Sequence, residues 1–95
     1  MKTEIVFSNK ASKNLIKQAK YIFEQTQSIS IADKYLNGMK HFIIEILSSF
    51  PQSGRPSPEI AKDTRKLVYQ GYSIIYKIQS NKIQILVIYR ENLPK

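Results

Sequence analysis

The sequence has 95 residues, with 15 Lys and Arg against seven Asp and Glu, one His and no Cys. A chain of this length supports one hydrophobic core, so we expect a single domain over residues 1–95, without disulfides, thiol catalysis or a cofactor cleft. With His41 as the only imidazole, we also expect no metal site. The net charge of +8 attracts polyanions, which are nucleic acid, anionic lipid or an acidic protein.

The N-terminal part predicts a short strand and then an amphipathic helix. Residues Thr3 to Ser8 alternate as in a strand, and Ser8 and Asn9 offer N-cap oxygens before the period changes. From Lys10 to about Gln25, apolar side chains recur at helical spacing. Another side of this helix carries what we call the lysine ridge, which consists of Lys10, Lys13, Lys17 and Lys20.

A second helix is predicted to run to about Phe50, where Pro51 ends it. Ser30 followed by Asp33 resembles a capping box at its start. Residues 26–29 show no periodicity, and two helices joined by a linker of about four residues fold back as an antiparallel hairpin. The expected core stripe of this helix consists of Ile31, Tyr35, Met39, Phe42, Ile43, Ile46 and Phe50.

The C-terminal part predicts a loop and then three strands. Pro and Gly residues restrict residues 51–62 to a loop, and alternation indicates strands over residues 65–69, 72–79 and 83–89. Short turns make these strands an antiparallel meander. The order β-α-α-β-β-β predicts an α+β fold with a helical hairpin on a mainly antiparallel four-stranded sheet. The place of residues 3–8 in the strand order stays open. We expect one face of the sheet to carry alternate residues of the last two strands, which are Tyr72, Ile74, Tyr76, Ile78, Ile83, Ile85, Val87 and Tyr89.

No stretch approaches the roughly 20 apolar residues of a bilayer-spanning helix. The N-terminus also lacks a charged segment followed by an apolar one, the pattern of a signal peptide. We therefore expect a cytoplasmic protein with no membrane partner and no small-molecule substrate.

An ordered set of motifs carries a family resemblance. Phe50-Pro51 is followed by Gly54-Arg55-Pro56, then by Gly71-Tyr72 and Ile75-Tyr76, and finally by the strand ILVIYR. Leu15, Tyr21-Ile22, Ala32, Arg65 and Leu67 fall at matching places. Over nearly the whole chain, the set resembles the RelE/ParE superfamily of toxins from type II toxin-antitoxin systems. The resemblance implies a growth-inhibiting toxin that an acidic antitoxin neutralises.

The resemblance leaves two targets open. The RelE branch consists of ribosome-dependent endoribonucleases, which typically carry Arg directly after the tyrosine of the Gly-Tyr turn, where this chain has Ser73. Such relatives also place a functional tyrosine and basic residues beyond the last strand, and residues 91–95 do not supply them. If the chain is a ribonuclease, catalysis would fall to Arg65, Lys66, Tyr89 and Arg90.

The ParE branch resembles the chain in its Gly-Arg loop and its Tyr-x-Ile-x-Tyr strand, and its members are thought to poison DNA gyrase by binding. We favour this branch, which implies a protein that is not an enzyme. RelE-like messenger RNA cleavage and a non-toxic basic binding domain remain the alternatives. ParE-like sequences often end the last strand with His or Gly before Arg, whereas this chain has Tyr89-Arg90-Glu91-Asn92, which leaves the target open.

Two sets of candidate residues follow. For the target we select Arg55, Arg65, Lys66 and Arg90, although Arg55 could instead pair with Glu59. Arg65 and Lys66 lie on opposite strand faces, and the solvent-facing one is the stronger candidate. For the antitoxin we select Lys13, Lys17, Lys20 and Ile44, although the lysines could form only a solvated helix face.

Overall fold

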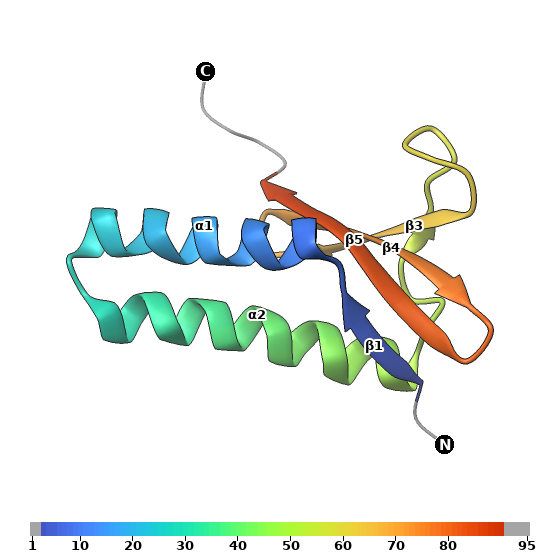
Figure 1. Cartoon of the computed structure of the whole chain (residues 1–95), viewed down its shortest axis with the longest axis horizontal. Coiled ribbons are helices and arrows are strands. Elements are labelled where there is room, and N and C mark those ends of the chain that lie inside the picture. The colour runs from blue at the N-terminus through green and yellow to red at the C-terminus, as the bar shows by residue number, and fades with distance from the viewer. Residues whose placement is uncertain (1–2, 91–95) are drawn as a thin grey trace.

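A computed structural model describes residues 3–90, and it contains two long helices packed on one face of a five-stranded mixed sheet (Figure 1). The predicted α+β fold with its helical hairpin is confirmed. The sheet has five strands instead of four, because a two-residue strand forms inside the predicted loop. The elements are β1 Glu4–Phe7, α1 Asn9–Thr26, α2 Ile29–Ser49, β2 Arg55–Pro56, β3 Thr64–Tyr69, β4 Tyr72–Gln79 and β5 Lys82–Arg90.

Serine side chains begin both helices. Ser8 Oγ accepts a hydrogen bond from the Ala11 N–H at 3.0 Å, as expected for the first cap. The predicted second cap at Ser30 is wrong, because Ser28 Oγ accepts from the Ile31 N–H at 3.2 Å and α2 already begins at Ile29. Gln27 takes a left-handed conformation with φ 57°, which ends α1 and shortens the linker to two residues, Gln27 and Ser28.

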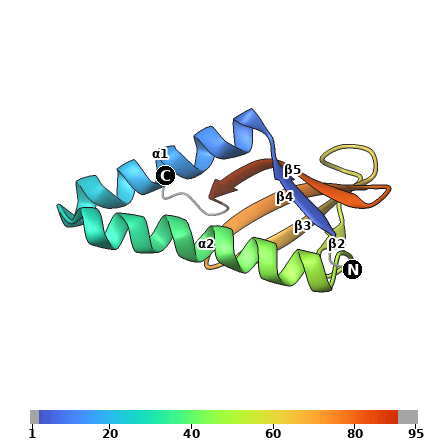
Figure 2. The same ribbon diagram turned by 60° about the horizontal axis from the view of Figure 1, so that its bottom comes forward.

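The strand order is β1-β5-β4-β3-β2, which answers the question that the sequence left open. β1 pairs in parallel with β5, with Ile5 opposite Ile83, and every other pairing is antiparallel. β5, the last strand of the meander, therefore lies between β1 and β4 (Figure 2). The free side of β1 forms one edge of the sheet.

The core lies between the helices and the strand faces beneath them. Met39, Ile43 and Leu47 of α2 are at most 1% exposed and pack with buried side chains of α1, β4 and β5. The ends of the predicted α2 stripe are wrong, since Ile31 is 47% and Phe50 64% exposed. A helix of 21 residues is about 31 Å long, and the α1–α2 turn projects beyond the sheet in Figure 1 and Figure 2. Residues in that projection have no strand beneath them.

A β-bulge in β5 changes which side chains face the helices. Ile75 lies opposite Val87, but its neighbour Tyr76 lies opposite Ile85, so Leu86 is an extra residue. The expected face holds for Ile83 and Ile85 and is wrong for the second half of the strand, where Ile88 is buried in the core instead of Val87 and Tyr89. The Ser8 hydroxyl donates to the Leu86 carbonyl at 2.8 Å, so the cap of α1 also holds the bulge.

Candidate functional site

The loop between α2 and β3 is held from inside by two side chains. The Tyr76 hydroxyl donates to the Pro51 carbonyl at 2.8 Å and accepts from the Gly54 N–H at 2.9 Å. Burial raises the pKa of this hydroxyl. Arg65 Nη1 donates to the Gly54 carbonyl at 2.6 Å and to the Gln52 carbonyl at 3.3 Å. The guanidinium of Arg65, a predicted target contact, therefore fastens this loop.

We call the face of the sheet away from the helices the outer face. It carries Lys66, the neighbour of Arg65 and also a predicted target contact. Arg65 lies opposite the core residue Tyr76, whereas Lys66 lies opposite Ile75 and beside Arg55. The two side chains thus occupy opposite faces, as predicted, and Lys66 is the one on the outer face. Lys77 shares this face, a position that its place after Tyr76 in the alternating strand could have indicated.

Among residues 3–90, the centre of the outer face is neutral. Ser73 lies between Val68 of β3 and Tyr89 of β5 and is 0% exposed. This serine stands where the resembling ribonucleases carry an arginine. The nearest cations of this face come from β2 and β3, with Lys77 further along β4.

The four residues named for ribonuclease chemistry do not converge. Lys66 and Tyr89 belong to the outer face, whereas Arg65 and Arg90 lie opposite Tyr76 and the core residue Tyr72, on the helix side. Those two partners are four residues apart on β4, which places the arginines about 13 Å apart along the strand. A single phosphate therefore cannot meet all four side chains in this arrangement.

Arg55 is exposed and pairs with Glu59 across 4.0 Å, as the sequence suggested. Both side chains are more than half accessible to water, so the pair contributes little stability. The Arg55 side chain is therefore available to a partner at a small energetic cost.

A groove between α2, β1 and α1 holds the predicted contact Ile44. We call it the α2 groove; its α2 wall presents Leu36, Lys40 and Ile44 on successive turns. The name covers two hollows that share no lining residue, one of about 450 Å³ at Ile44 and one of about 140 Å³ at Lys40. Ile16, which the sequence analysis missed, is 64% exposed at its α1 side, and Ile44 is 44% exposed. Ile5 and Phe7 of β1 form the remaining apolar wall.

The lysine ridge divides between two sides of α1. At 100° per residue, Lys13 and Lys20 lie next to Ile16 and so flank the α2 groove. Lys17 instead lines a hollow of about 230 Å³ on the β5 side, with Gln18, Tyr21 and Arg90. Lys17 and Arg90, which the sequence assigned to different partners, thus share one site. Tyr21 was missed, although its spacing of four from Lys17 places it on the same helix side.

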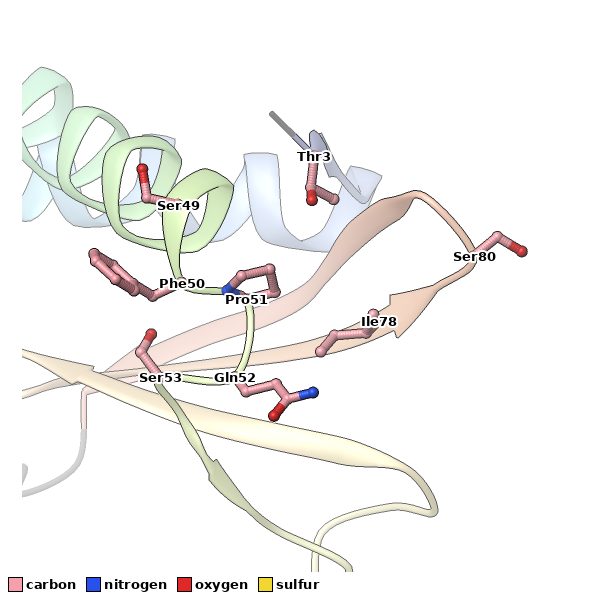
Figure 3. A pocket seen from close by; sticks show the side chains of 8 residues that line it. All are labelled: Thr3, Ser49, Phe50, Pro51, Gln52, Ser53, Ile78 and Ser80. Carbon is pink, nitrogen blue, oxygen red and sulfur yellow. The ribbon is translucent and has the colours of Figure 1, made fainter. Parts of the chain in front are cut away.

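A further hollow of about 660 Å³ lies below the end of α2 (Figure 3). The described residues of its lining are uncharged, namely Thr3, Ser49, Phe50, Pro51, Gln52, Ser53, Ile78 and Ser80. These eight residues include no acid or base, so they can bind a ligand but cannot transfer protons. Within residues 3–90, no group of three His, Asp or Glu side chains could hold a metal, and no helix is long and apolar enough to cross a membrane.

Comparisons with known proteins agree with this architecture. The family model of the ParE toxin of the type II toxin-antitoxin system parDE matches residues 5–92. A structure of the chromosomal ParDE system from P. aeruginosa superposes with a TM-score of 0.79 at 18% identity, covering 95% of this chain and 97% of that one. The toxin-antitoxin complex RelBE2 from Mycobacterium tuberculosis gives a TM-score of 0.72 at 19% identity, with coverages of 95% and 92%. No curated protein matches significantly.

Proposed function

Since the chain belongs to the family of ParE toxins of type II toxin-antitoxin systems, we propose that it inhibits growth in the cytoplasm by binding DNA gyrase, and that an acidic antitoxin neutralises it. We favour a binding mechanism because the buried residue at the centre of the outer face is Ser73. In-line cleavage of RNA requires cations at the phosphate together with an acid and a base. The hydroxyl of Ser73 cannot supply a positive charge there.

The outer face supports target binding in a second way. Arg55 and Lys66 lie side by side on β2 and β3, and Tyr89 is 36% exposed on the same face. Cations and an aromatic ring on a rigid sheet are typical of binding surfaces, where Arg and Tyr contribute most of the energy. We assign the target contact to this surface, with Arg65 as the residue that holds its neighbouring loop.

The α2 groove suits the antitoxin. It is apolar at Phe7, Ile16 and Ile44, and it has lysines at its margins. A disordered segment with acidic and apolar residues gains from both features when it folds onto this surface. The free edge of β1 adds unpaired backbone groups beside the groove, which an extended segment can pair with.

The target is tested with two assays on the same purified chain. We expect inhibition of gyrase supercoiling, weakened in Arg55→Ala and Lys66→Ala in parallel with gyrase binding, and intact messenger RNA on programmed ribosomes. Lys82→Ala, exposed in the β4–β5 turn region, is the matched control. Codon-specific cleavage of messenger RNA that Lys66→Ala abolishes, with ribosome binding retained, would establish the ribonuclease alternative. Activity in neither assay would favour a non-toxic binding domain.

The antitoxin surface is tested with the small acidic protein expected from the neighbouring reading frame. Ile44→Ala should weaken the complex about tenfold or more if this side chain is an anchor. Ile29→Ala is the control, because Ile29 is also an exposed isoleucine of α2, at 67%, but lies outside the groove. Equal effects of the two substitutions would exclude the groove. Association should also slow with added salt, because the charges are exposed.

A further inference from the structure

The hollow formed by Lys17, Gln18, Tyr21 and Arg90, which we call the Lys17 hollow, remains outside the proposed function. Its position follows from how α1 covers the open side of β5. Beyond Ile85 that side has no strand partner among the described residues, and Asn14 Oδ1 accepts from the Ile88 N–H at 3.0 Å instead. The α1 side chains of the next turn therefore lie beside the end of β5, where Arg90 stands.

The floor and the wall of the hollow are fixed by packing. The Tyr72 hydroxyl, on a residue only 2% exposed, donates to Gln18 Oε1 at 3.2 Å. This bond orients the Gln18 amide and leaves its N–H groups as donors. The Arg90 guanidinium lies 6.0 Å from the centre of the Tyr21 ring, at the outer limit of a cation–π contact. A half-buried arginine is thus in contact with an aromatic side chain, and no carboxylate of residues 3–90 pairs with it.

The positive charge of the hollow is not neutralised within the described chain. The two ion pairs among residues 3–90 are His41–Glu45 and Arg55–Glu59, and neither includes Lys17 or Arg90. Glu24 is the acidic residue of α1, one turn beyond Lys20. The rest of the lysine ridge extends the positive field along α1 for about 15 Å between Lys10 and Lys20.

We propose that the Lys17 hollow binds a phosphodiester group of a nucleic acid. A guanidinium fork and an ammonium group facing one space match the oxygens of a phosphate. An acidic protein segment fits less well, because Tyr21 is the one hydrophobic side chain among the described residues that line this hollow, whereas the α2 groove offers several, among them Phe7, Ile16 and Ile44. Tyr21 is 43% exposed, so its ring can contact a neighbouring sugar or base. This goes beyond the proposed function, which requires contact with proteins only.

The experiment measures binding of the full chain to fluorescent oligonucleotides over a range of salt concentrations, without gyrase or antitoxin. Each phosphate contact adds about 0.9 to the slope of log affinity against log salt for duplex DNA, or about 0.7 for a single strand. Lys17→Gln and Arg90→Gln should each lower the slope by that amount. Separate duplex and single-stranded probes show which form supplies the phosphodiester.

Lys82→Gln is the matched control, since it removes the same charge from an exposed residue at the other end of β5, about 26 Å from Arg90. It should leave the slope unchanged, and Arg90→Lys should keep the slope while weakening the affinity. Lys17 is exposed, so Lys17→Gln decides the question if Arg90→Gln does not fold. Equal slope changes in Lys17→Gln and Lys82→Gln would overturn the proposal. So would a dependence on Lys17 and Arg90 that appears with an acidic peptide and not with either oligonucleotide.

Discussion

On the helix side, β4 contributes Tyr72, Ile74 and Tyr76 to the apolar core, whereas on the outer face the same strand contributes Ser73 and Ile75. All five are at most 2% exposed, so burial alone does not separate the two faces of a central strand. The neighbouring elements distinguish the two faces, because β2 and β3 place cations around one face and the helices cover the other. A central strand thus supports both faces, and the function of each face depends on its neighbours.

The largest expected effect is on the helix side. Leu47→Ala should lower the free energy of unfolding by about 2–5 kcal/mol, because the side chain is 0% exposed in the core. Phe42→Ala should have a smaller effect than full burial would give, since its ring is only partly buried and stacks on Tyr69 with ring centres 4.3 Å apart. Denaturant unfolding measures both. A Leu47→Ala protein as stable as the parent would contradict the assignment of this face.

The next effect concerns the hydroxyl that crosses from the core to the loop. Tyr76→Phe removes the partner of the Pro51 carbonyl and of the buried Gly54 N–H, so it should cost about 1–3 kcal/mol. Tyr72→Phe is the control and should cost less, because among the described residues the Tyr72 hydroxyl bonds to the Gln18 side chain alone. Thermal melting of the two variants side by side gives the order of the two losses, and the reverse order would contradict the role of the Tyr76 hydroxyl in holding the loop.

The same two hydroxyls predict a pH dependence. Burial raises the pKa of both Tyr72 and Tyr76 above 10.0, although the nearby Arg90 and Arg65 charges oppose it. The folded chain therefore keeps these protons to higher pH than the unfolded chain does, and stability is unaffected well below pH 10 and falls as pH rises beyond it. The Tyr72→Phe/Tyr76→Phe protein should lose less stability over this range, with lysine deprotonation common to both proteins. Equal losses of stability in the double variant and the parent would contradict burial of the two tyrosine hydroxyls as the cause.

The smallest expected effect is on the outer face. Arg55→Ala should change the free energy of unfolding by no more than about 0.5 kcal/mol, because its pair with Glu59 is exposed and 4.0 Å long. Growth inhibition by this variant should nevertheless fall. If stability and toxicity both stay at parental values, Arg55 belongs to neither face's function.

Much of this fold could be predicted from the sequence, because period and turn chemistry are local. The cap Ser8, the helical spacing from Lys10 onward and the short turn between the last two predicted strands each fall at or within two residues of an observed boundary. The extra residue Leu86 could not be found in this way, since it is defined only by the pairing of β5 with β4. Ser28 and Ser30 are the same residue type, and the left-handed Gln27 decided between them.

The candidate sites were less predictable, since they join residues that are distant in sequence. Arg65 looked like a surface cation, but the loop that returns to β3 presents two carbonyls to it. Lys17 and Arg90 are 73 residues apart, and only the docking of α1 beside β5 places them in one hollow. Ile44, by contrast, could be recognised as exposed from its angle on the helix alone.

The parallel pairing of β1 with β5 has a consequence for protein synthesis. The bond from Ser8 to Leu86 spans 78 residues, and β5 is the strand between β1 and the rest of the sheet. The helical hairpin has only local contacts to form, but the sheet cannot be completed until β5 has left the ribosome. The edge of β1 and the groove beside it are therefore completed only after β5 has been synthesised, so a nascent chain cannot present the complete surface that we propose for the antitoxin before that point.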